Sequence, residues 1–260
     1  MSNVVTDFVD VFTRWQTWWL MASNDIKLRY RRSLIGPFWI SLTMATMILG
    51  IALLFGQIYE QEFRDFLFFL GCSFLIWFFI SSLMNDACTV LIENEGILRS
   101  APIKTPLLAA RSVARNVIIF GHNALAVTGM LLIMRWEPTI AALWAIPAVL
   151  LVTAFGYFFA VAIAPLCLRF RDVAQVVTNL LQILFFMTPV MWPPTQGRVS
   201  ESFIKMNPFY HLVELFRAPI YTGVAPTELN WNVSLGMLGG VLILAVVSAA
   251  TSRSKIYLWL

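Results

Sequence analysis

The feature that most constrains this chain is a run from Ser33 to Tyr59 that contains no Asp, Glu, Lys, Arg or His. A helix needs roughly 20 apolar residues to cross a bilayer, because lipid offers no hydrogen-bond partners to backbone groups outside regular structure. Three later stretches have a similar character. Hydrophobic residues make up 59% of the 260 residues and charged residues only 12%, which is outside the usual range of soluble domains. The sequence therefore predicts an all-α, polytopic integral membrane protein.

Six apolar spans are predicted, together with a stretch that is only partly apolar. The spans are Ser33–Ile58, Phe66–Asp86, Asn116–Met134, Ile140–Leu168, Val173–Trp192 and Val233–Thr251. Between the last two, charges and prolines interrupt Ser200–Gly223, so we expect short re-entrant helices there; an external loop with one surface helix is the alternative. The expected organisation is an interface segment over 1–32 followed by one transmembrane domain over 33–260.

The distribution of basic residues predicts the orientation of these spans. Lys and Arg concentrate in the short loops and helix ends that face the cytoplasm. Of the 18 basic residues, thirteen lie before the first span, in the second-to-third and fourth-to-fifth connections, or after the sixth span. The other five lie on the opposite side. Both termini are therefore predicted to be cytoplasmic.

The N-terminal segment has the pattern of an amphipathic helix at the membrane interface. Apolar and aromatic residues recur at the spacing of one helix face, namely Phe8, Val11, Phe12, Trp15, Trp18 and Trp19. Packing of this face on the protein's own core is the alternative. Both interpretations hold if the helix lies at the membrane surface beside the bundle.

A basic collar, Lys27, Arg29, Arg31 and Arg32, directly precedes the first span. Its contribution to orientation alone would explain it. Arg also binds phosphate oxygens in bidentate fashion, and a cation near an anionic membrane surface contributes about 1 kcal/mol. We therefore assign Arg29, Arg31 and Arg32 to the phosphate of a lipid head group, with a diphosphate-bearing lipid attracted most.

The chain contains no phosphate-binding loop, metal-ligand spacing or nucleophile motif, so catalysis by this chain is not expected. Asp86 lies at the edge of the second span, where solvation of a helix end is a better explanation than proton relay. Several aromatic residues fall inside the spans: Trp39, Phe74, Trp77, Phe78, Phe185, Phe186 and Trp192. Helix packing or lipid contact would account for them. Their functional interpretation is a substrate channel lined by flat rings, along which a chain of sugars slides.

Four stretches together resemble the membrane subunit of polysaccharide exporters of the ABC-2 type. They are Asp25–Trp39, Glu93–Arg99, Phe170–Val173, and Asn207–Tyr210 with Phe216 and Arg217. The resemblance implies a homodimer of this chain, joined to two copies of a nucleotide-binding ATPase subunit that carries ATP and Mg. It also implies export of a lipid-linked polysaccharide across the bacterial inner membrane. No cofactor or metal is expected on this chain, and no nucleic-acid partner is expected, because the net charge of +4 is explained by the orientation signal.

The resemblance also identifies residues that would couple this chain to the ATPase. The loop Glu93–Lys104 resembles a coupling helix, and Arg169–Val173 resembles a second contact. The coupling residues are then Glu93, Asn94, Glu95, Arg99, Arg171 and Asp172. O-antigen is the expected cargo, since the start of the first span is most similar to that branch. The alternatives are capsular polysaccharide or teichoic acid in the same family and, from other classes, a secondary transporter or a membrane glycolipid enzyme.

Overall fold

The computed structural model describes residues 4–29, 31, 33, 36, 38–59, 61–100, 103–194 and 199–259. These residues form helices and turns and include no β-strand. The elements in chain order are α1 (Val4–Thr13), α2 (Trp15–Arg29), α3 (Phe38–Ile58), α4 (Phe63–Glu93), α5 (Glu95–Ser100), α6 (Thr105–Ile133), the 3₁₀ helix η1 (Ile140–Trp144), α7 (Ala145–Arg169), α8 (Asp172–Met187), α9 (Glu201–Met206), α10 (Pro208–Tyr221), α11 (Glu228–Ser252) and α12 (Ile256–Trp259).

Five helical segments among the described residues are long and apolar enough to cross a membrane. They are α3, α4, α6, the continuous segment Ile140–Arg169, and α11, and their mean hydropathy lies between 1.7 and 2.3. The chain is therefore an all-α, multi-pass membrane protein. The fifth predicted span corresponds to α8, which is apolar but has only 16 residues. The count of six crossings stays a prediction.

Helix α4 is the centre of the bundle. In its most apolar window 83% of residues are buried, against 22% in α3 and 11% in α11. Helices α3, α6, α7, α8 and α10 all pack against it. From Phe66 to Trp77 every residue of α4 is buried, so this part of the helix is enclosed by its neighbours on all sides.

Helices α4 and α7 approach each other closely at Gly156. A Cβ atom on this glycine would lie 2.8 Å from Cδ1 and 2.9 Å from Cβ of Leu83. Because Leu83 is itself buried, it has little room to retreat. Glycine at position 156 therefore sets the distance between the two helices.

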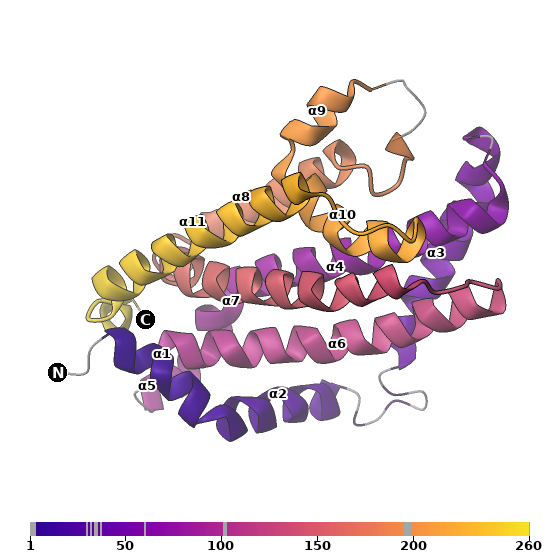
Figure 1. Ribbon diagram of the computed structural model, residues 1–260. Helices are drawn as coiled ribbons and strands as arrows, with labels where there is room; N and C mark the ends of the chain where they lie inside the picture. Colours follow the sequence, from indigo (N-terminus) through magenta and orange to yellow (C-terminus); the bar gives the residue numbers. More distant parts are fainter. Residues whose placement is uncertain are drawn as a thin grey trace.

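Both termini lie at one end of the bundle, which also carries α5 and α12 and is called the terminal end below (Figure 1). The N-terminal segment is helical, as predicted, and a turn at Arg14 divides it into α1 and α2. Both helices pack on α6. The predicted apolar face is divided accordingly: Val11 is buried, whereas Phe12 is 80% exposed.

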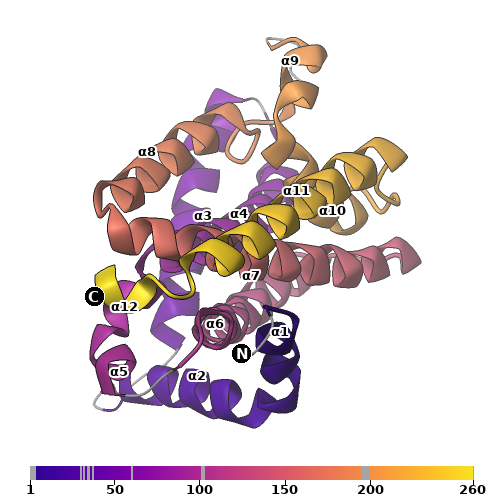
Figure 2. The same ribbon diagram turned by 90° about the vertical axis from the view of Figure 1, so that its left-hand side faces the viewer.

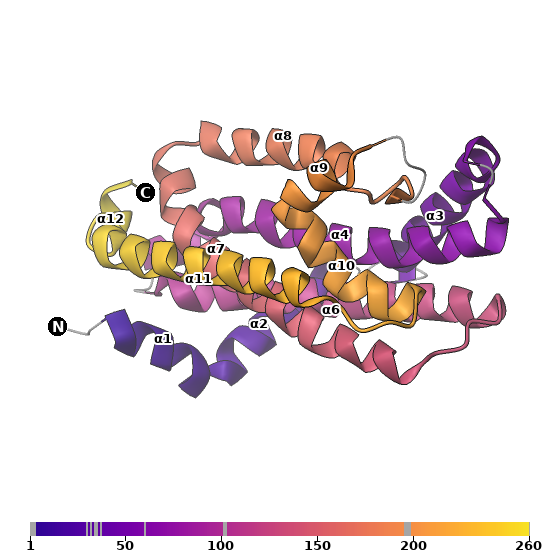
Figure 3. The ribbon, with the colours of Figure 1, turned by 45° about the horizontal axis from the view of Figure 1, so that its top comes forward.

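The stretch predicted to be re-entrant forms α9 and α10, which meet at Asn207. The side chain of Asn207 accepts a hydrogen bond from the backbone N–H of Phe209 and donates one to Oγ1 of Thr188, at 3.0 and 2.8 Å. Helix α10 packs against α4, α7 and α11, and α8 runs along another side of the bundle (Figure 3). How deeply α9 and α10 enter the membrane stays a prediction.

Candidate functional site

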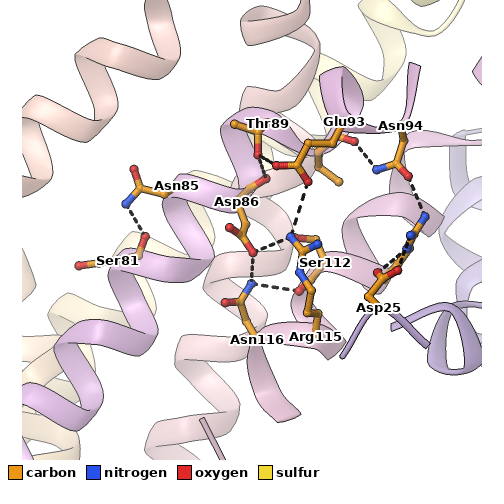
Figure 4. Close-up of polar contacts among 12 residues, drawn as sticks. Asp25, Ser81, Asn85, Asp86, Thr89, Glu93, Asn94, Ser112, Arg115 and Asn116 are labelled. Carbon is orange, nitrogen blue, oxygen red and sulfur yellow. Dashed lines mark hydrogen bonds and ion pairs between the residues drawn. The ribbon is translucent and has the colours of Figure 1, made fainter. Parts of the chain in front are cut away.

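A cluster of polar side chains joins α4 and α6 toward the terminal end (Figure 4). Arg115 of α6 donates from Nη2 to Oδ2 of Asp86 at 2.8 Å, and the amide of Asn116 donates to the same oxygen at 2.8 Å. A carboxylate of Glu93 lies 3.8 Å from the same Arg115 nitrogen. Asp86 thus joins two helices, with its side chain 30% exposed.

A second ion pair extends this cluster to α2. The guanidinium of Arg111 binds both carboxylate oxygens of Asp25, at 2.8 and 2.7 Å, which is the bidentate geometry that Arg favours. Its remaining nitrogen donates to Oδ1 of Asn94 at 2.7 Å. Asn94 caps the end of α4 and leads into α5. We call Asp25, Asp86, Glu93, Asn94, Arg111, Arg115 and Asn116 the terminal-end network.

This network corrects the interpretation of Asp86 as a solvated helix end. Its carboxylate is occupied by Arg115 and Asn116 instead of water alone. The predicted second and third spans also stop short of the helices, because α4 runs to Glu93 and α6 begins at Thr105. Charged residues were expected to lie outside the spans, but pairing across the helix interface lets them lie within α4 and α6.

The start of α6 is tied to α1 by a separate ion cluster. The Lys104 ammonium lies 2.7 Å from Asp7 and 2.6 Å from Asp10. Hydrogen bonds to Asp10 and then Asp7 raise the pKa of Lys104 above its usual value. The hydrogen bond from Lys104 lowers the pKa of the Asp10 carboxyl. Both groups are thus charged near neutral pH, and α1 is held against the loop that follows α5.

The predicted coupling loop contains α5, a short helix anchored by a single side chain. Leu98 is only 2% exposed and packs in a cluster with Leu91, Leu108, Leu168 and Ile256. On the outer surface, Arg99 donates to Glu95 from Nε and Nη2, at 3.0 and 2.7 Å. The loop therefore combines a fixed apolar anchor with a charged outer face.

The second predicted contact, Arg171 and Asp172, follows α7 at the same end. Both side chains are exposed. The preceding Arg169 lies over the rings of Phe170 and Trp259, with centroid distances of 4.9 and 5.4 Å. Figure 2, which looks at the terminal end, shows α5, α12 and the turn between α7 and α8 on one face. Two segments distant in sequence thus present polar residues on a common surface.

The basic collar is only partly described. Arg29 and Arg31 are exposed, and Lys27 is also on the surface of α2. Arg32 lies outside the described residues. The structure leaves the charges of the described collar accessible, as phosphate binding would require.

The aromatic residues predicted to line a channel fall into different environments. Phe74, Trp77 and Phe185 form one cluster, in which the Phe185 centroid lies 5.7 Å from Phe74 and 5.8 Å from Trp77. Phe74 and Trp77 are buried within the subunit. Phe78 extends the cluster from Phe74, at 5.7 Å.

The other aromatic residues lie nearer the surface. Phe186 is 65% exposed and accepts, through its carbonyl, a hydrogen bond from the Trp192 indole at 3.1 Å. Trp39 is half-exposed on α3 and lines a surface groove together with Phe78. The substrate-channel role of the whole set stays a prediction.

Sequence reasoning did not identify Asp25, Arg111, Arg115 or Asn116 as members of a site. Arg111 and Arg115 were counted as charges that set orientation, whereas Asp25 only began a stretch of family resemblance and Asn116 only began the third predicted span. A usable signal was present, since Asp86 ends one predicted span and Glu93 follows it, while Arg111 and Arg115 precede the next span. Consecutive antiparallel spans bring such ends together, so opposite charges there predict pairing.

The terminal end of this multi-pass bundle thus carries partly exposed ion pairs between helices, beside a short helix that is anchored by Leu98. The family model described as "ABC-2 type transporter" matches residues 16–221. The chain therefore belongs to the ABC-2 type transporter membrane family.

Individual relatives cover nearly the whole chain. The O-antigen export system permease protein RfbA of Myxococcus xanthus is 25% identical over 240 residues, which is 90% of this chain and 91% of the relative. A protein of the same name from Klebsiella pneumoniae is 20% identical over 241 residues, or 91% of each chain. The polysialic acid transport protein KpsM of Escherichia coli is 25% identical over 223 residues, covering 80% of this chain and 83% of the relative.

Proposed function

We propose that this chain is the membrane-channel subunit of an ATP-driven exporter of lipid-linked polysaccharide, with O-antigen as its cargo. The observation that carries the proposal is similarity along 90% of the chain to a protein named as an O-antigen export permease. Capsular polysaccharide is the second candidate, because the similarity to the polysialic acid transport protein also covers most of the chain.

The proposed assembly has two copies of this chain and two copies of a separate ATPase subunit, which binds ATP and Mg. It lies in the bacterial inner membrane with both termini in the cytoplasm. Exposed apolar side chains on α3, α8 and α11 support contact with lipid and with a second copy. Thirteen basic residues predicted on the terminal side support its cytoplasmic location.

Coupling in this proposal is mechanical. The ATPase contacts α5 and the turn at Arg171, and ATP binding shifts the relative stability of two arrangements of the membrane helices. Leu98 transfers a displacement of α5 to the ends of α4, α6 and α7, since it packs with residues from all three. The terminal-end network then carries the displacement to α2 through Arg111 and Asp25.

The substrate's route follows the residues assigned from sequence. Arg29, Arg31 and Arg32 bind the phosphate of the lipid carrier at the membrane interface. The aromatic residues provide many weak, interchangeable contacts for the glycan, whereas unpaired buried charges would be costly to desolvate.

Deleting the gene in its source bacterium tests this function. Surface O-antigen should be lost completely, and lipid-linked polysaccharide should accumulate inside the cell; both are measured by immunoblotting of intact and lysed cells. The wild-type chain should restore export, as should Lys205→Met, which removes an exposed charge far from the terminal end. Loss of capsule in place of O-antigen would select the second candidate. Unchanged surface polysaccharide of every class would contradict the proposal.

A further inference from the structure

An apolar groove lies between the N-terminal helices and the bundle. Its volume is about 620 Å³, and its lining residues come from α1, α2, α6, α7 and α11. Within the described part of the chain this lining includes no Asp, Glu, Lys, Arg or His. The volume falls in the range of small-ligand sites. The coupling scheme and the substrate route proposed above use none of these lining residues.

The groove reaches about as deep as one leaflet of a bilayer. Its wall on α6 extends to Val117, twelve residues after this helix begins at Thr105, which is about 18 Å along the helix axis. Half of the hydrocarbon core of a bilayer is about 15 Å thick. Helices α6 and α7 are both long and apolar enough to span the membrane. An acyl chain that enters from the terminal end would therefore lie along the groove.

The lining favours an apolar occupant. The indole of Trp18 donates to the carbonyl of Val11 at 2.8 Å, and the hydroxyl of Thr153 donates to the carbonyl of Val149 at 2.7 Å. These polar groups of the lining are thus satisfied by the chain itself. A polar ligand would lose its hydrogen bonds to water on entering such a groove, whereas an aliphatic chain loses none.

A cation lies beside the groove in the chain. Arg14 occupies the turn between α1 and α2, and its neighbours Phe12 and Trp18 both line the groove. The Arg14 side chain is exposed, and it forms no ion pair with any of the described residues. Asp10, one helical turn earlier, is bound by Lys104 at 2.6 Å. Arg14 is therefore available to a phosphate, which its guanidinium binds well.

We infer that this groove holds an acyl chain of a resident anionic phospholipid, in the leaflet at the terminal end, and that Arg14 binds the phosphate of this lipid. The inference does not depend on the identity of the cargo. The cargo phosphate is assigned to the basic collar, where Arg29 lies eleven residues, about 16 Å, beyond Trp18 along α2. The bound lipid joins α1 and α2 to α7 and α11, and so supports the helix that carries Asp25 of the terminal-end network.

Photo-crosslinking in vesicles tests the site through the composition of the attached lipid. The photoreactive residue p-benzoylphenylalanine, which inserts into C–H bonds, replaces Leu150, which lines the groove and is 64% exposed. A matched control replaces Ile243, which is 63% exposed on α11 and does not line the groove. The purified full chain is reconstituted in phosphatidylcholine with phosphatidylglycerol as the minor component, and mass spectrometry identifies the lipid adducts after irradiation.

The measured quantity is the ratio of phosphatidylglycerol to phosphatidylcholine adducts. At the Ile243 probe this ratio should equal that of the vesicle. At the Leu150 probe it should be about fivefold higher, because one Arg near a net negative head group contributes about that factor. Equal ratios at the two probes would mean that only bulk lipid contacts the groove, and would overturn the inference.

Four substitutions then examine recognition on the Leu150 probe. Arg14→Gln should lower the adduct ratio to that of the Ile243 probe, whereas Lys255→Gln, which removes another exposed cation at the terminal end, should leave it unchanged. Ala154→Phe places a ring within the groove and should lower the ratio in the same way. Its control, Ala250→Phe, lies at an exposed position of α11 outside the lining and should have no effect.

The remaining outcomes identify other occupants. An enriched ratio that survives Arg14→Gln would overturn the assignment of the head group; since Arg14 is exposed, this variant is expected to fold. A covalent dimer of the chain in place of lipid adducts would identify a second copy in the groove. Displacement of the phosphatidylglycerol adduct by an added isoprenoid phosphate, at an equal amount of unlabelled lipid, would identify a lipid carrier of the cargo. Either of these last two results would overturn the inference and leave the export function standing, because that function is tested by gene deletion.

Discussion

The two ends of the bundle hold their charges in different ways. At the terminal end, the ion pairs Arg111–Asp25 and Arg115–Asp86 have side chains that are 15–30% exposed, and they join different helices. Toward the other end, Arg217 of α10 is only 2% exposed. It donates to Ser73, to the carbonyl of Pro189 and to Glu214, and lies 4.7 Å from the centroid of Phe69.

This difference indicates which end can rearrange. A charge enclosed as completely as Arg217 cannot exchange its partners for water, and loss of a partner leaves an uncompensated charge. Partly exposed pairs can separate at much lower cost, because water replaces the lost partner. The Arg217 cluster (Arg217, Glu214, Ser73, Phe69 and Pro189) therefore holds α10, α4 and the segment after α8 together, whereas the terminal-end network is suited to transmit motion.

The largest effect is expected for Arg217→Met. It leaves Glu214 without its cation inside the bundle, which should lower the free energy of unfolding by about 3–5 kcal/mol. Thermal and SDS-induced unfolding of the purified protein in detergent measures this loss. Replacing both partners, Arg217→Met with Glu214→Gln, should recover part of it, because neither residue then carries an unpaired charge.

The matched control for this prediction is Lys205→Met on α9. Lys205 pairs with Glu201 at 2.6 Å, but the two side chains are 47% and 79% exposed. Its loss should change stability by less than about 1 kcal/mol. Equal effects of Arg217→Met and Lys205→Met would show that enclosure of Arg217 does not raise the cost of removing its charge.

A smaller loss of stability is expected for Arg111→Met in the terminal-end network. The bidentate pair with Asp25 is partly exposed, so its removal should cost about 1.5–3 kcal/mol, the range for hydrogen bonds to charged groups. Polysaccharide export should fall more than this stability loss accounts for, because the ion pair that joins α2 to α6 is lost. A double-mutant cycle with Asp25→Asn, measured by unfolding and by export, separates the pair from its surroundings. Independent, additive effects in both measurements would contradict a coupling role.

The sequence was informative about these regions to different degrees. The apolar runs predicted the long helices, and the spacing of Phe8 and Val11 predicted helix near the N-terminus, because both signals are local. The burial of α4 could not be predicted in this way, because α11 is equally apolar but mostly exposed, and which helix is enclosed depends on packing between distant segments. The same limit applies to Arg217. Its charge alone predicts an external position, and its burial depends on Ser73 and Pro189, which are far away in the chain.

In the candidate site, too, features set by local sequence could be predicted, and features set by packing between distant segments could not. The loop that we propose for coupling could be placed between the second and third spans from sequence, because this polar segment is continuous and resembles that of a known family; its coupling role stays a prediction. The Arg111–Asp25 pair could not be predicted, since it exists only where α2 packs on α6. The apolar groove could not be predicted either, since it forms only where α1, α2, α6, α7 and α11 meet.

The smallest effect on stability, but a full effect on export, is expected at α5. Glu95→Arg combined with Arg99→Glu keeps an ion pair within the helix and reverses the charges that α5 presents, so stability should change by less than about 0.5 kcal/mol. Export and polysaccharide-stimulated ATP hydrolysis in the complex should be lost, since the partner would meet the opposite charge pattern.

Position 95 is a sharper test than position 93, because Glu93 also contacts Thr89 and Arg115, and its reversal would disturb the terminal-end network as well. Normal export by the swapped variant would exclude the charged face of α5 from coupling, and a large loss of folded protein would show that the pair has a structural role instead.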